Sequence, residues 1–183
     1  MNRWTPRLLA ACVGLWSMTG ALAQQPPSRA MLEGLFPKGA PVCFARYYDA
    51  AHLKRHPAQS VTSVRLMRGF QQVRGDAERN PADAITIELI VTYRDSGTRR
   101  FLGDAGCGPS LDNQITCYSS SCDGGSFPVK VEDADTILIG GAQGRSRFTV
   151  SGGCGDDGPG RSLGRSADDT VFRLTRMPIS ACR

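Results

Sequence analysis

The chain has 183 residues, a formal charge of +5, seven cysteines and 21 glycines. Without residues 1–23, which have the features of a leader, 160 residues remain, with six cysteines and a charge of +3. This length suits a single domain. A charge this small gives no reason to expect a nucleic-acid partner. Because no run of 18 apolar residues occurs, we expect no transmembrane segment in the mature chain.

The leader is a predicted signal peptide over residues 1–23. Arg3 and Arg7 make its start positive, residues 8–18 are mostly apolar, and an Ala-x-Ala cleavage site ends at Ala23. These features predict a periplasmic or secreted protein. Two alternatives stay open, a buried N-terminal helix and lipidation at Cys12, which follows only a short apolar stretch.

Cleavage after Ala23 leaves an even set of cysteines: Cys43, Cys107, Cys117, Cys122, Cys154 and Cys182. An even number in an exported chain predicts three disulfides. Zinc is the weaker alternative, because the closest pair has a four-residue spacer and no second pair matches it. We expect Cys107 to pair with Cys117, since a short turn over 108–113 would place them on facing strands. The other pairings stay open.

Two helical segments are expected near the start of the mature chain. Residues 24–41 form a lead-in, in which 30–36 predicts one or two helical turns before a proline. The stronger signal is a helix over 48–56, because Asp49 suits the N-cap position and Pro57 ends the segment.

Short strand signals dominate the remainder. Residues 85–93 alternate apolar and polar side chains, as a half-buried strand does. We expect about eight strands, at 61–67, 85–93, 99–103, 114–118, 127–131, 136–139, 147–151 and 170–176. The predicted fold is all-β, a small disulfide-stapled antiparallel barrel or sandwich with a short N-terminal helix, and a single β domain over 42–183. Residues 71–81 and 155–167 are expected to be loops without fixed structure.

An internal repeat relates residues 90–108 to 137–155. Seven of 19 positions are identical, including an Arg-Phe pair and a Gly-Cys-Gly run. The repeat predicts two related halves, about 43–117 and 122–182, each with a hairpin whose outgoing strand buries a phenylalanine. Chance similarity between hairpins with glycine turns is the alternative.

Three motifs carry a resemblance to known proteins: Cys117-x4-Cys122-Asp123-Gly124-Gly125, the Gly-Cys-Gly of 153–155, and Asp168-Asp169-Thr170-Val171-Phe172-Arg173-Leu174. Together with residues 48–53 and His56-Pro57, they resemble an uncharacterised group of small exported bacterial proteins. The resemblance covers most of the mature chain. It implies bacterial export and brings no activity or catalytic residue with it.

The two histidines of the chain, His52 and His56, lie four residues apart on the predicted helix, with Asp49 on the same stripe. Imidazole and carboxylate together suit zinc, copper or nickel, so these three residues are the candidate metal ligands. The alternative is structural, with His56 at the helix C-terminus, where a cation is favoured.

Other charged residues have ordinary explanations. The paired carboxylates Asp156-Asp157 and Asp168-Asp169 are expected to be solvated turn residues. Arginines on or beside the strands could form an anion-binding face or a solvated exterior: Arg65, Arg68, Arg94, Arg99, Arg100, Arg145, Arg147, Arg173 and Arg176.

No catalytic motif is present, because the chain has neither a G-x-S-x-G turn nor a free-thiol nucleophile in the expected oxidised state. We therefore expect an exported, monomeric, non-enzymatic module without a cofactor, which binds a protein or a small ligand. The alternative is a metal-binding protein that uses Asp49, His52 and His56.

Overall fold

The computed structural model describes residues 27–37, 40–68, 85–109, 114–119, 124–141, 147–150, 160–164 and 166–183. Eight antiparallel strands of this part close into a barrel in the order β5-β4-β3-β2-β1-β10-β7-β6, with β6 returning to β5. Their bounds are β1 Val42–Tyr47, β2 Val61–Arg68, β3 Ile85–Tyr93, β4 Phe101–Pro109, β5 Ile115–Ser119, β6 Gly125–Asp133, β7 Thr136–Gly140 and β10 Val171–Met177. The predicted all-β antiparallel barrel is confirmed.

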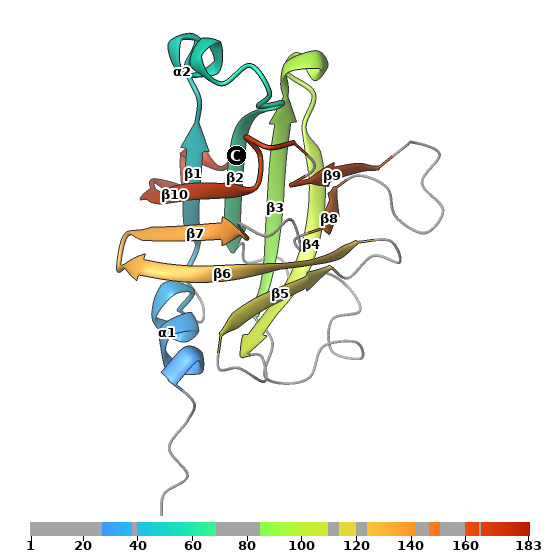
Figure 1. Ribbon diagram of the computed structural model, residues 1–183. Coiled ribbons are helices and arrows are strands. Elements are labelled where there is room, and N and C mark those ends of the chain that lie inside the picture. Colours follow the sequence, from blue (N-terminus) through green and yellow to red (C-terminus); the bar gives the residue numbers. More distant parts are fainter. Residues whose placement is uncertain are drawn as a thin grey trace, which may run out of the picture.

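The barrel is an up-and-down meander that the first and last strands close. β1 pairs with β10 through Cys43 and Met177, Phe44 and Arg176, and Ala45 and Thr175. Figure 1 shows β1 to β4 side by side with their axes aligned and their directions alternating, while β10, β7, β6 and β5 cross them at an angle. The side chains between the two groups of strands form the core.

Five phenylalanines dominate that core, each at most 1% exposed: Phe36, Phe44, Phe127, Phe148 and Phe172. Phe127 and Phe148 meet edge to face, with ring centroids 4.9 Å apart, which is a favoured aromatic geometry. Gly103 leaves room for this packing, because a Cβ there would lie 2.7 Å from a ring carbon of Phe148. Among the described residues, aromatic and aliphatic side chains fill the centre of the barrel.

Two further strands, β8 (Arg147–Val150) and β9 (Arg161–Leu163), extend the sheet from β6. The expectation of no fixed structure over 155–167 is wrong for β9. Leu163 lies in the core, and Arg161 makes two bonds to Asp95, so specific contacts hold this glycine-rich segment in place. The other predicted loop, 71–81, lies outside the described residues.

The repeat has one structural parallel and one difference. Phe101 and Phe148, which the repeat aligns, are both buried. In the first copy β3 and β4 form a hairpin, whereas β7 and β8 both pair with β6. The predicted hairpin of the second copy is therefore wrong among the described strands, and the repeat itself stays a prediction from the sequence.

Two short helices lie at opposite ends of the barrel in Figure 1: α1 (Pro27–Leu35) and α2 (Ala50–Arg55). Both were expected near these positions. The lead-in is more than a connector, because Leu32 and Leu35 of α1 and the adjacent Phe36 belong to the main core cluster. None of the buried side chains of the domain comes from α2.

Two disulfides are present among the described residues. Cys107 and Cys117 face each other on β4 and β5 and are bonded, as predicted. Cys43 is bonded to Cys182 across 139 positions of sequence. Cys122 and Cys154 lie outside the described residues, so the third predicted disulfide stays a prediction.

The Cys43–Cys182 disulfide fixes the C-terminal tail to the outer face of the barrel. Tyr47 Oη donates to the backbone oxygen of Ala181, and Arg100 Nη2 donates to that of Arg183 at 3.3 Å.

Arg65 is only 5% exposed on the outer side of β2. Its burial lowers the pKa of its guanidinium.

Two strand predictions need correction. β1 was not expected, because its sequence lacks alternation, yet it pairs with a strand on each side. β4 was placed at 99–103 but runs from Phe101 to Pro109. It continues through the glycines because Ala105 and Cys107 point into the core.

Candidate functional site

The candidate metal residues lie on and beside α2, where each has a local contact. Asp49 is the N-cap, as predicted, and its carboxylate accepts from His52 N at 2.6 Å. His56 is the C-cap residue and donates its backbone N–H to His52 O. The imidazoles of His52 and His56 stack with centroids 4.4 Å apart.

The buried side chain of Gln59 is hydrogen-bonded to one ring nitrogen of His52. Gln59 Nε2 donates to Val61 O at 2.8 Å, so its Oε1 accepts, and this oxygen lies 3.0 Å from His52 Nε2. Nε2 is then the protonated nitrogen of that ring, and a protonated nitrogen cannot ligate a metal. Within the described ranges, no three His, Cys, Asp or Glu side chains are grouped to hold a metal ion.

Arg94 holds α2 against the end of β3. Its Nη2 donates to Leu53 O and to His56 O, both at 2.7 Å. These carbonyls belong to the last turn and C-cap of the helix, where backbone acceptors lack partners within the helix. The Arg94 guanidinium therefore supplies hydrogen-bond donors for the backbone carbonyls at the C-terminus of α2.

The carboxylate of Asp169 accepts four hydrogen bonds at this end of the barrel. The residue is 2% exposed, so the expectation of a solvated turn residue is wrong for Asp169. Its carboxylate accepts from Ser60 N at 2.7 Å, Ser60 Oγ at 2.5 Å, Val61 N at 3.3 Å and Ser166 Oγ at 2.9 Å. These bonds join the start of β2 to the segment before β10.

Two tyrosines lie near this carboxylate. Burial raises the pKa of Tyr48 and of Tyr93, and the charge of Asp169 adds to both shifts. Tyr93 Oη is buried and has no hydrogen-bond partner among the described residues. Arg161 lies over the Tyr93 ring, 4.9 Å from its centroid, and its bonds to Asp95 hold the pKa of that carboxyl below its usual range.

Several of the strand arginines make contacts within the fold. Within the described part of the chain, several bond to carboxylates or to backbone oxygens at different ends of the barrel. Arg68 donates to Phe36 O, Arg94 to α2, Arg173 to Glu132 and Arg176 to the β6–β7 turn. Their main contribution is therefore to join segments of the fold.

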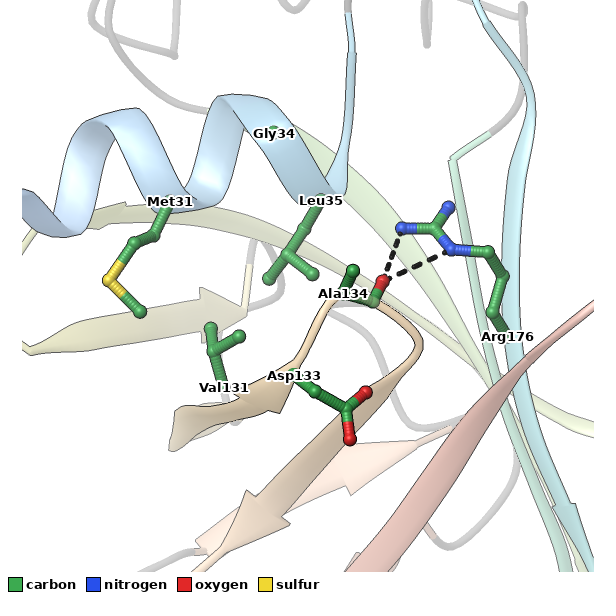
Figure 2. Close-up of a pocket in the computed structure, with 7 residues that line it drawn as sticks. All are labelled: Met31, Gly34, Leu35, Val131, Asp133, Ala134 and Arg176. Carbon is green, nitrogen blue, oxygen red and sulfur yellow. Dashed lines mark hydrogen bonds between the residues drawn. The ribbon is translucent and has the colours of Figure 1, made fainter.

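An open groove lies at the opposite end, between α1 and the β6–β7 turn. Figure 2 shows Met31 and Leu35 projecting from the helix above Val131 of β6, with Arg176 at the far side. The space measures about 250 Å³, and its surface is mostly apolar. Met31, which is 46% exposed, gives the groove a wall that is apolar and open to solvent.

Gly34 also lines this groove. A Cβ built on it meets no atom within 4 Å, so packing does not require glycine here. Glycine inside a helix costs about 1 kcal/mol relative to alanine. The bare helix surface leaves the groove open.

Charges occur at one rim of the groove. Arg176 donates to Ala134 O at 2.9 Å and lies 3.1 Å from Asp135 Oδ1. Asp133 accepts from Asp135 N, a bond that lowers the pKa of the Asp133 carboxyl. The rim therefore combines a paired arginine with a carboxylate that is ionised at neutral pH.

Sequence reasoning missed this groove and the role of Asp169. The groove forms from residues about 100 positions apart, and Asp169 bonds to Ser60 and Val61 at a separation of more than 100. In the sequence, the one signal for the groove was Gly34, because a glycine inside a predicted helical turn lowers helix stability and can have a packing or functional reason.

The chain matches no known family model, no curated protein and no solved structure in the comparisons made. No helix in the described ranges has both the length and the apolar character that crossing a membrane requires. The two disulfides are compatible with an extracellular or periplasmic protein.

Proposed function

We propose that the protein is an exported, non-enzymatic binding module, and that it engages a protein partner through the groove between α1 and the β6–β7 turn. The single observation that carries the proposal is the open, apolar groove over Gly34. Gly34 exposes bare helix backbone at this groove, and glycine is a residue that allows another molecule to approach the backbone closely.

The filled interior supports binding on the outer surface. Eight-stranded barrels that carry small ligands hold them in a central cavity. In this barrel phenylalanines and aliphatic side chains occupy the centre. A groove of about 250 Å³ is also smaller than most small-molecule pockets, so a protein side chain suits it better than a free ligand.

The polar residues support a non-enzymatic role. Two groups of polar side chains among the described residues, around α2 and around Asp169, are engaged in bonds that hold segments together. Export is proposed from the leader over residues 1–23 and agrees with the two disulfides. N-terminal sequencing of the exported protein is expected to begin at Gln24.

Selection from a displayed library of random peptides tests the function. The mature protein is the target, and Gly34→Leu, which adds a large side chain to the helix surface that lines the groove, is the matched control. We expect enriched peptides to bind the parent protein and to lose binding to Gly34→Leu. Enrichment that is equal on both proteins, or absent on both, would contradict the proposal.

Metal binding through Asp49, His52 and His56 remains the second candidate, since the two imidazoles lie in contact. The Gln59 bond to His52 opposes it. We expect zinc titration of the mature protein to give at most weak binding. A tight site that is lost in both His52→Ala and His56→Ala would favour the metal function instead.

A further inference from the structure

The size and lining of the groove limit what can enter it. About 250 Å³ accommodates one large side chain, and Met31, Leu35 and Val131 offer it apolar contact. Methionine is flexible and adapts to side chains of different shape. The part of a partner that enters the groove is therefore a single aromatic or large aliphatic side chain.

The charge balance of the neighbouring turn indicates what accompanies this side chain. Glu132 is paired with Arg173 at 2.7 Å, and Asp135 is paired with Arg176 at 3.1 Å. Asp133, which lines the groove, forms no ion pair with another described residue. Its carboxylate accepts from the backbone N–H of Asp135 and from the backbone and side chain of Thr136, and the charge of Arg173 also acts on it. Among these described residues, three carboxylates face two arginines, so the turn beside the groove carries a net negative charge.

We infer that the groove binds a peptide segment of a partner protein in which a large apolar side chain lies next to a lysine or arginine. The apolar side chain packs between α1 and β6, and the cation lies near Asp133. This inference rests on the proposed function, because it specifies the chemistry of the partner for the same groove. The charge complementarity sets preference among partners, while apolar burial supplies most of the affinity.

Four short capped peptides in a Gly-Ser background test the inference: Phe-Lys, Phe-Glu, Phe-Gln and Ser-Lys. Binding to the ¹⁵N-labelled mature protein is followed through the amide signals of Gly34 and Ala134. We expect Phe-Lys to bind about threefold more tightly than Phe-Gln and more tightly still than Phe-Glu, as for an exposed charge pair. Ser-Lys is expected to bind at least about tenfold more weakly than Phe-Lys.

Two substitutions assign the preference to its source. Asp133→Asn keeps the acceptor for Asp135 N and removes the charge, so Phe-Lys and Phe-Gln are expected to bind it equally. Asp168→Asn, the same change at the other end of the barrel, is expected to keep the preference. Gly34→Leu is expected to remove binding of all four peptides while the rest of the amide spectrum stays unchanged.

The possible results separate the inference from the proposed function. If the three phenylalanine peptides bind equally and Gly34→Leu still removes binding, the inference is wrong and the proposed groove function holds. If none of the peptides moves the Gly34 and Ala134 signals, both are contradicted. A lysine preference that survives Asp133→Asn would also overturn the inference.

Discussion

The two ends of the barrel are closed in different ways. At one end α2 buries no side chain and its C-terminus accepts hydrogen bonds from Arg94, while Ser60 and Val61 at the start of β2 donate to Asp169. At the other end α1 contributes apolar side chains, chiefly Leu32, Leu35 and Phe36, to the core. One end is thus closed by polar bonds and the other by apolar burial.

The difference explains why the open surface lies at the α1 end. Hydrogen bonds are directional, so a carboxylate with four donors fixes the segments around it closely. Apolar burial depends on area and fixes only the buried face of a helix. The remaining face of α1, with Met31 and Gly34, stays available beside Val131.

The largest effect is expected for Phe36→Ala at the α1 end. Phe36 is 1% exposed and meets Phe44 edge to face, with centroids 5.7 Å apart. Removing the ring should lower the free energy of unfolding by about 3–5 kcal/mol. Urea denaturation measures this, with Met31→Ala on the exposed side as a control that changes stability by less than about 1 kcal/mol. If both variants lost the same free energy of unfolding, the buried face of α1 would not be what closes this end of the barrel.

A smaller loss is expected for Asp169→Asn at the α2 end. The amide accepts fewer hydrogen bonds than the carboxylate and turns its NH₂ group toward the Ser60 and Val61 donors. Leaving such donors unpaired should lower the free energy of unfolding by about 2–3 kcal/mol. Asp168→Asn is the matched control and should be near neutral. A neutral Asp169→Asn would show that the polar bonds at this end add little.

Arg94→Gln should have a smaller and more local effect. The change removes both Nη2 bonds to Leu53 O and His56 O, so stability should fall by about 1 kcal/mol. Hydrogen exchange is expected to rise at the amides of α2 and to stay unchanged in α1. A similar rise in both helices would mean that the two ends are coupled rather than independent.

The smallest effect is expected for Glu88→Gln, away from both ends. Burial raises the pKa of the Glu88 carboxyl, and the nearby Asp104 raises it further. The folded state then binds the proton more tightly than the unfolded state, so stability falls as pH rises through the folded-state pKa. Glu88→Gln should raise stability by about 0.5 kcal/mol at pH 7, given the partial exposure of the side chain.

The pH profile checks the sign of the Glu88 effect. Thermal unfolding of Glu88→Gln and of the parent protein should converge near pH 4, where the parent carboxyl is largely protonated. A gap that widens as pH falls would contradict the raised pKa. It would instead mean that the Arg65 charge dominates at this site.

Local signals predicted the parts of the fold that depend on neighbouring residues. The helix over 48–56 was expected from Asp49 and Pro57, and α2 forms there with Asp49 as its N-cap. The Cys107–Cys117 bond was expected because the two residues lie on adjacent strands. In both cases the residues that determine the structure lie within about ten positions of one another.

Features that depend on distant partners were not predictable in this way. β1 has no alternating pattern and is held by β2 and β10. β9 has only three residues and owes its place to β8 and to Asp95. Asp169 looked like a turn residue because its donors lie more than 100 positions earlier. The groove, likewise, exists only once α1 lies beside the β6–β7 turn.

Pairing of β1 with β10 also limits when the protein can fold during synthesis. A nascent chain that still lacks residues 171–177 has every other barrel strand but cannot close the barrel between β1 and β7. The Cys43–Cys182 bond needs the last segment as well. Until then the edges of β1 and β7 are exposed and can pair with other chains. The barrel is therefore most open to wrong pairing while β7 is already made and the segment that carries β10 and Cys182 is not.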